Sequence, residues 1–169
     1  MSHARSFAAV ADKSATVLIL GSMPGQASLL AQQYYAHPRN AFWRIQGDLI
    51  GARPELPYAE RLRLLRANGI ALWDVLESCI RVGSLDSDIE ELSVVANDFA
   101  GFFKRHRNIR RVFFNGAKAE QSFQRHVHAG LASLALRYWR LPSTSPAHAG
   151  MPYAKKLEAW RAITAAELA

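Results

Sequence analysis

The chain has 169 residues, half of them hydrophobic, and a net charge of +7 with a pI near 10.0. This size suits one domain spanning residues 1–169, and no apolar run approaches the length of a membrane span. The positive charge indicates a polyanionic partner, with nucleic acid first, although a basic surface that only aids solubility stays open. Basic residues concentrate in "FFKRHRNIRR" (102–111).

The opening stretch, "MSHARSFAAVADKSATV", lacks the apolar core of a secretory signal, so we expect a cytoplasmic protein. The single cysteine, Cys79, excludes an internal disulfide, a cysteine-ligated iron–sulfur cluster and a cysteine-based zinc site. Its apolar flanks favour a buried, inert thiol over a nucleophile. The six histidines show no ligand spacing, and we expect neither a metal nor a cofactor.

Short apolar runs that end in turn residues alternate along the chain with segments of helical spacing. The runs are "ATVLILG" (15–21), "IALWDV" (70–75), "RRVFFNG" (110–116) and "LALRYWRLPS" (134–143). Continuous apolar runs are typical of buried parallel strands. The alternation predicts an α/β fold, a three-layer α/β/α sandwich with a central, mostly parallel four-stranded sheet.

The helical segments show the expected apolar faces and end signals. Phe42, Ile45 and Leu49 share one face, and Asn68-Gly69 is a C-cap. A helix over 88–106 would have acids in its first turn and bases in its last, which suits the helix dipole. The helices are expected within residues 40–51, 58–69, 88–106, 117–130 and 153–169.

Ligands in such folds bind beyond the carboxyl ends of the strands, so the loops after residues 21, 75, 115 and 142 form the candidate site. The first loop, "GSMPG" (21–25), fits neither the P-loop spacing nor the dinucleotide-binding spacing. Its glycines let the backbone approach a ligand closely, and Pro24 stiffens the turn. A plain tight turn remains an alternative.

The segment "YYAHPRNAFWRI" (34–45) comes next. Tyr34 and Tyr35 are either core aromatics or a platform for a flat ligand. Asn40 is either a helix N-cap or an amide that accepts from a water while it donates to another atom.

Each of the two later loops also allows two interpretations. Asn115, at the end of its strand, is part of an ordinary turn or reads the edge of a base. The loop "LPSTSPAHAG" (141–150) places three hydroxyls between prolines, which suits phosphate contacts and insertion into a nucleic-acid groove. Clusters of this composition are also common in ordinary loops.

Taken in this order, the segments resemble the uracil-DNA glycosylase superfamily over residues 16 to 165. "ILGSMPG" resembles the first motif, and "AHPRNAFWRI" is similar to the His-Pro-x-Asn-x-Phe-Trp stretch of the mismatch-specific uracil/thymine branch. "VFFNGAKA" stands where the superfamily has its base-reading strand end. "LPSTSPAH" resembles the second motif, which forms the minor-groove loop.

Two positions depart from the usual pattern. Met23 stands where related branches carry an Asn and the main uracil branch has an Asp in that loop, and Leu141 replaces the His or Asn that opens the second motif. The hypoxanthine-DNA glycosylase branch lacks both groups. "GSMPG" and "LWDVLESCIRVGSLDSDI" (72–89) resemble that branch, in which the catalytic Asn is implied at the position of Asn40.

The resemblance implies a monofunctional, monomeric, nucleoid-associated DNA glycosylase that flips a deaminated base, hypoxanthine first, out of DNA and hydrolyses its N-glycosidic bond. Asn40 would position water below C1′ or stabilise the departing base, and Tyr35 would stack on that base. The base contacts would also include Gly21, Ser22, Met23 and Asn115. The DNA contacts would come from Pro142, Ser143, Thr144, Ser145, His148 and Lys118.

Other functions remain open. One is excision of uracil or mismatched thymine. A second is a non-catalytic module that binds lesions, which would explain the missing polar groups at positions 23 and 141. A small-molecule nucleoside hydrolase would need neither the positive charge nor the 141–150 loop.

Overall fold

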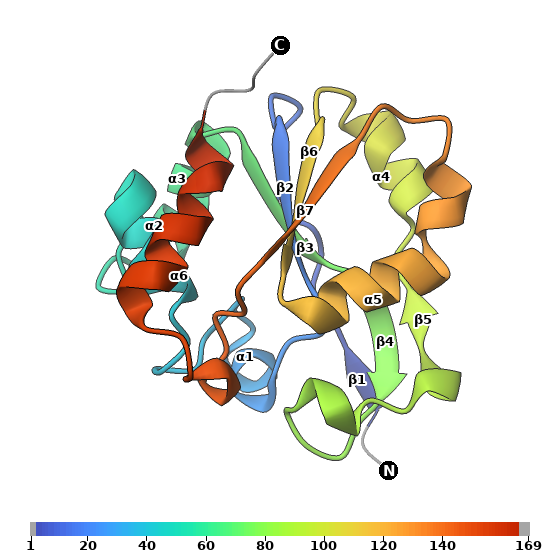
Figure 1. The fold of residues 1–169 in the computed structure, drawn as a ribbon, viewed down its shortest axis with the longest axis horizontal. Coiled ribbons are helices and arrows are strands. Elements are labelled where there is room, and N and C mark those ends of the chain that lie inside the picture. Colours follow the sequence, from blue (N-terminus) through green and yellow to red (C-terminus); the bar gives the residue numbers. More distant parts are fainter. Residues whose placement is uncertain (1–2, 166–169) are drawn as a thin grey trace.

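The computed structural model describes residues 3–165, which form two sheets and six α-helices (Figure 1). The central sheet is entirely parallel, with strand order β3-β2-β6-β7, and this confirms the predicted α/β sandwich. Its strands are β2 (Val17–Gly21), β3 (Ile70–Asp74), β6 (Arg111–Asn115) and β7 (Arg137–Leu141). All four carboxyl ends therefore lie at one edge, where Gly21 is opposite Asp74 and Asn115 is opposite Leu141.

The strands read as continuous apolar runs because both faces of the sheet are covered. Val17 and Ile19 of β2 face one core, while Leu18 and Leu20 face the other. The first core lies under α2 (Phe42–Ile50), α3 (Tyr58–Ala67) and α6 (Tyr153–Trp160). The second lies under α4 (Phe99–Arg105) and α5 (Ala117–His126), on the opposite side in Figure 1.

A small antiparallel sheet was not predicted. It consists of β1 (His3–Arg5), β4 (Leu76–Ile80) and β5 (Val95–Ala96), in the order β1-β4-β5. Its strands come from distant parts of the chain, so a local pattern gave no sign of it. The short α1 (Gln26–Ala31), also unpredicted, follows the first loop at the carboxyl edge of the parallel sheet.

The continuous helix predicted over 88–106 is wrong in its first half. Asp88 and Glu91 lie in two short 3-10 turns, Glu90 lies between them, and α4 begins only at Phe99. Two local features explain the late start. The β-branched Val94 and Val95 favour extended backbone, and the Asp98 carboxylate accepts a hydrogen bond of 3.0 Å from the Gly101 N–H as an N-cap.

The other helices lie within their predicted segments. The segment 153–169 is α-helical to Trp160 and continues as a 3-10 turn to Thr164, while 166–169 lie outside the described residues. Cys79 is fully buried, as predicted, and burial raises the pKa of its thiol. Within residues 3–165, none of the helices is both long enough and apolar enough to cross a membrane.

Candidate active site

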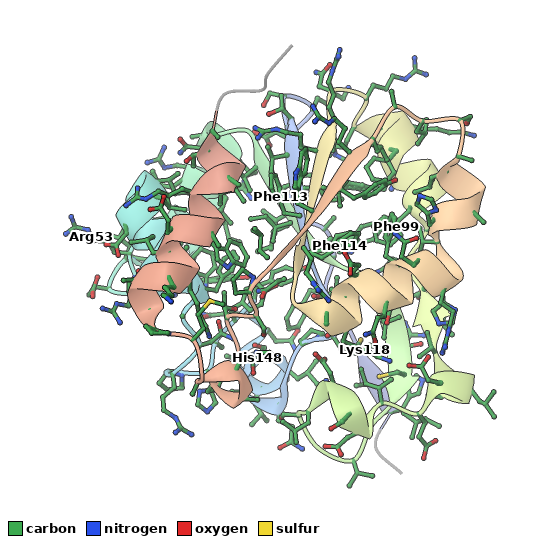
Figure 2. All side chains as sticks on the ribbon, viewed as in Figure 1. Arg53, Phe99, Phe113, Phe114, Lys118 and His148 are labelled. Carbon is green, nitrogen blue, oxygen red and sulfur yellow. The ribbon has the colours of Figure 1, made fainter. Side chains whose placement is uncertain are left out.

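A cavity of about 850 Å³ opens at the carboxyl edge of the parallel sheet. Its floor is formed by the last residues of three strands, Gly21, Asp74 and Asn115. Its lining includes most of the residues that the sequence nominated: Gly21, Ser22, Met23, Tyr35, Asn40, Asn115, Ser143, Thr144, Ser145 and His148. Lys118 lines an adjoining hollow with Ser143 and His148, and Figure 2 labels Lys118 and His148 at this end of the molecule.

Gly21 is where the floor is most crowded. A Cβ on this residue would lie 2.6 Å from Asp74 Oδ1 and 2.8 Å from the Tyr35 hydroxyl oxygen. No side chain fits there without displacing both neighbours. The first loop therefore begins with glycine because an acid and a phenol approach its backbone.

Tyr35 forms one wall of the cavity. Its ring stacks on Phe42 with a centroid distance of 4.1 Å and an interplanar angle of 20°. Its backbone has φ +55°, a left-handed conformation that costs a non-glycine residue about 1 kcal/mol. Burial, followed by the nearby Asp74, raises the pKa of its hydroxyl, which has no hydrogen-bond partner among the described residues.

Asn40 lies at the mouth of the cavity, just before α2. Its Oδ1 accepts a hydrogen bond of 2.9 Å from the Phe42 N–H, but the N-cap residue of α2 is Ala41, so the N-cap alternative is wrong by one residue and Asn40 braces the turn that leads into the helix. This bond uses Oδ1 as the acceptor and does not involve the amide nitrogen of Asn40. Because Asn40 also lines the cavity, this turn bond is compatible with a second role.

Asn115 joins the sheet to the 141–150 loop. Its Nδ2 donates to Thr144 Oγ1 at 2.9 Å, and its Oδ1 accepts from the Thr144 N–H at 3.0 Å. Thr144 is only 1% exposed. These two residues hold the loop in place, so the exposed surface of the loop consists of its other residues.

The rest of this loop is also anchored. The Trp160 indole donates to the Pro142 carbonyl at 2.9 Å, and Lys156 Nζ donates to the His148 carbonyl at 2.7 Å. Gly116 has φ +93°, and a Cβ there would be 3.0 Å from Ser143 Cβ. One backbone hydrogen bond, from the Ala41 N–H to the Thr144 carbonyl at 3.0 Å, joins the loop to the Asn40 segment.

Met23 and Leu141, which replace the customary polar groups, are packing residues. Met23 is 8% exposed and belongs to the core under α4 and α5, and Leu141 is 5% exposed and belongs to the other core. The first loop is fixed further by polar contacts. Ser22 Oγ donates to Asp86 Oδ1 at 2.5 Å, and buried Arg81 donates to the Pro24 carbonyl at 2.5 Å.

Lys118 occupies the first turn of α5, at the helix start where the sequence placed it. Its ammonium group forms an ion pair with Glu91, whose carboxylate also accepts from Arg125 at 3.2 Å. The hydrogen bond from Lys118 lowers the pKa of Glu91. Glu91 thus offsets much of the positive charge beside the hollow.

Sequence reasoning missed Asp74. Its side chain is buried on the cavity floor, and its Oδ2 has no hydrogen-bond partner among the described residues. Burial, followed by repulsion from Asp86, raises its pKa to about 7, against an opposing effect of Arg81. One sequence signal could have identified Asp74. It is a lone acid at the end of an apolar strand, and folds of this kind bind ligands at that edge of the sheet.

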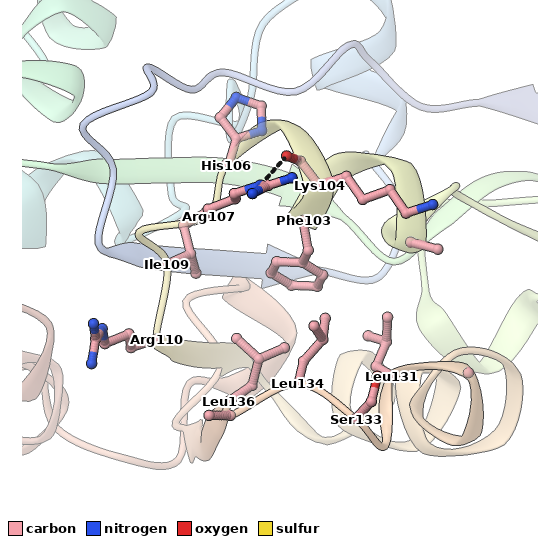
Figure 3. A pocket seen from close by; sticks show the side chains of 13 residues that line it. Phe103, Lys104, His106, Arg107, Ile109, Arg110, Leu131, Ser133, Leu134 and Leu136 are labelled. Carbon is pink, nitrogen blue, oxygen red and sulfur yellow. Dashed lines mark hydrogen bonds between the residues drawn. The ribbon is translucent and has the colours of Figure 1, made fainter.

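Basic side chains gather in two other places. A groove of about 1150 Å³ shares Tyr35, His37 and Asn40 with the cavity mouth. Four arginines also line it: Arg39, Arg44, Arg53 and Arg61. The basic concentration at 102–111 lies elsewhere, beside an apolar cavity of about 520 Å³ at the amino ends of β6 and β7 (Figure 3).

The described residues contain no group of three or more His, Cys, Asp or Glu side chains placed to hold a metal ion. The side chains that line the cavity carry amide, hydroxyl, carboxyl, imidazole and aromatic groups. Together these groups can hold a flat heterocycle, bind water and exchange a proton.

The sequence model of the uracil DNA glycosylase superfamily matches residues 8–167. Two proteins named hypoxanthine DNA glycosylase are similar to the chain. One, from Methanosarcina acetivorans, is 42% identical over 68% of this chain and 72% of its own; the other, from Methanosarcina barkeri, is 39% identical over the same shares. A solution NMR structure from Methanosarcina acetivorans, provisionally named a uracil DNA glycosylase, has a TM-score of 0.80 at 34% identity and covers 96% of this chain and 97% of its own.

Proposed function

Because the chain belongs to the uracil DNA glycosylase superfamily, we propose that it is a monofunctional DNA glycosylase that removes hypoxanthine from DNA. The observation that carries this proposal is the cavity at the carboxyl edge, which brings Tyr35 and Asn40 of the 34–45 segment together with Asn115 at the end of β6. The two relatives named hypoxanthine DNA glycosylase support this choice of base.

DNA would bind along the edge that carries the cavity. The arginine groove meets the cavity at Asn40, so it can follow the phosphates of the strand that carries the lesion. The anchored 143–148 segment offers Ser143, Ser145 and His148 to the duplex, while Pro142 and Thr144 hold its shape. A rigid loop suits insertion into the space that the flipped nucleotide leaves.

Within the cavity, the flipped base would lie against Tyr35, whose other face is covered by Phe42. Backbone groups of Gly21, Ser22 and Met23 would contact its edge, with the remaining amide hydrogen of Asn115. Asn40 would place a water below C1′. Since an amide is a poor base, positioning and electrostatic stabilisation of an oxocarbenium-like transition state would supply the rate.

The proposal also covers the oligomeric state of the protein, its DNA partner, its location and the role of Lys118. The protein would act as a monomer on DNA that contains deaminated bases, in the cytoplasm at the nucleoid. On binding DNA, Lys118 would leave its ion pair with Glu91 and contact a phosphate instead.

The test uses duplexes that each contain one inosine, xanthine or uracil, with an unmodified duplex as the control. After incubation, alkali cleaves any abasic sites, and strand breaks are counted. We expect breaks at inosine first. A protein that binds the inosine duplex but yields no breaks with any lesion would be a lesion-binding module, and breaks mainly at uracil would reverse the order of bases.

Asn40→Ser gives the matched variant for the catalytic assignment. Serine can still accept the hydrogen bond from the Phe42 N–H at the start of α2, but it lacks the amide group. We expect the fold to be retained and the single-turnover rate to fall by roughly 100-fold or more. Full activity of Asn40→Ser would limit Asn40 to its turn bond with the Phe42 N–H.

A further inference from the structure

The floor of the cavity holds a carboxyl group to which the mechanism above assigns no role. Asp74 ends β3 directly opposite Gly21, and it is 3% exposed. Its Oδ2 is enclosed and has no hydrogen-bond partner among residues 3–165. A buried polar atom without a partner costs free energy, so its place on a ligand cavity points to a ligand that completes it.

The neighbouring groups favour the protonated form of this acid. Asp86 is the negative neighbour, and Arg81, held by the Pro24 carbonyl, is the positive one. The hydroxyls of Tyr34, Tyr35 and Tyr58 are the other titratable groups that its charge affects. Burial and Asp86 prevail over Arg81, and the pKa of Asp74 is raised to about 7. A substantial fraction of the carboxyl therefore carries a proton at neutral pH.

A protonated carboxyl is a donor, and a flipped 6-oxopurine offers adjacent acceptors at O6 and N7. We propose, on the basis of the proposed function, that Asp74 is a catalytic acid whose O–H donates to N7 of the flipped purine and protonates N7 as the base departs. Adenine carries the same N7 acceptor, so this contact serves catalysis and does not by itself distinguish hypoxanthine from adenine.

The step balances without a co-reactant. The C1′–N9 bond breaks, and its electron pair stays on the purine. The proton of Asp74 moves to N7, so the base leaves as neutral hypoxanthine. The oxygen of the water near Asn40 bonds to C1′, and the proton that this water loses returns to the Asp74 carboxylate through solvent.

Single-turnover cleavage of an inosine duplex as a function of pH tests this role. The wild-type rate should fall tenfold per pH unit above about pH 7, as the acid form of Asp74 is lost. Asp74→Asn keeps a hydrogen-bond donor but cannot supply a proton, so its rate should fall by roughly 100-fold or more and lose this dependence. Asp86→Asn should move the wild-type limb to lower pH, because it removes the repulsion that favours protonation.

Asp12→Asn is the matched control, since Asp12 is exposed and lies outside the cavity lining. It should leave the rate and its pH dependence unchanged. A duplex with 7-deaza-2′-deoxyinosine keeps O6 and lacks the N7 acceptor. We expect the wild type and Asp74→Asn to cleave it equally slowly. Rapid cleavage with the same alkaline limb would overturn protonation at N7.

Two outcomes separate this inference from the proposed function. If the wild type cleaves inosine and Asp74→Asn keeps both its rate and its pH profile, the role of Asp74 is wrong and the glycosylase proposal stands. If the wild type forms no abasic sites, the glycosylase proposal fails. Calorimetric titration with free hypoxanthine at pH 6 and pH 8 then decides whether Asp74 binds the base. Tighter binding at pH 6, lost in Asp74→Asn, supports it, and equal binding overturns it.

Discussion

The two ends of the parallel sheet differ in how they use polar side chains. At the amino ends of β6 and β7, basic residues surround an apolar cavity, and Arg107 and Arg110 are exposed (Figure 3). At the carboxyl ends, polar groups such as Asp74 and Thr144 are buried. Burying a polar group costs free energy unless a partner or a ligand satisfies it. Buried polar groups beside a cavity therefore mark the candidate site more specifically than exposed charges do.

Among the changes that test this difference between the two ends of the sheet, Gly21→Ala should have the largest effect. Its Cβ would collide with Asp74 and Tyr35, and a displacement of about 1 Å in a catalytic site can cost roughly 100-fold in rate. Gly130→Ala is the matched change at the amino-end cavity, where an added Cβ meets nothing within 4 Å. Single-turnover assays should show a large loss for the first variant and none for the second. Equal effects would remove the distinction.

Asp74→Asn should raise the free energy of unfolding at pH 8, even as activity falls. The native pKa of about 7 lies above the ordinary value of 3.8, so ionisation opposes folding increasingly as pH rises from 4 to 7. The full gap corresponds to roughly 4 kcal/mol as a ceiling. Urea unfolding of both proteins at pH 4 and pH 8 measures it. A gain that is the same at both pH values would contradict the shifted pKa.

Asn115→Ala should cost about 2 kcal/mol of stability, because it removes two hydrogen bonds to Thr144. Asn108→Ala provides the comparison at the other end. Its exposed amide makes one bond, to the Lys13 carbonyl at 3.1 Å, and its loss should cost less than about 0.5 kcal/mol. Urea titrations measure the free energy of unfolding of both variants. Similar losses would mean that the hydrogen bonds at the carboxyl end contribute no more to stability than the one at the amino end.

The smallest effects concern DNA affinity. Arg39→Gln, in the groove at the cavity mouth, should weaken duplex binding a few-fold and lower the salt slope by about one. Arg107→Gln, at the amino end, should change affinity by less than about twofold. Fluorescence anisotropy over a range of salt concentrations compares them. A larger effect at Arg107 would place DNA at the opposite end.

The fold was predictable because its main signals are local. β2 and β6 are apolar runs bounded by turn residues, so their positions follow from the sequence. The pairing of β1 with β4 joins Ala4 to Cys79, and no short-range pattern encodes such a contact. The helix over 88–106 failed for a different reason: the bond from the Gly101 N–H to Asp98 starts α4 at Phe99, and this local N-cap signal was outweighed by the charge pattern of the whole segment.

The site was predictable in part. Four segments were expected at one edge, and the cavity brings them together. What the residues do there depends on burial, which a sequence does not state. Thr144 was expected to face DNA but is buried against Asn115. Asp74 received no role because its environment, and hence its raised pKa, is created by folding.

The hydrogen bond from the Ala41 N–H to the Thr144 carbonyl carries a consequence for how this site tolerates mutation. It links the segment proposed to hold the attacking water to the loop proposed to meet DNA, which are about a hundred residues apart in the chain. Both partners are peptide groups, so substitutions at either position preserve the link unless proline replaces Ala41. The side chains around it can therefore vary while these two segments keep the same position relative to each other.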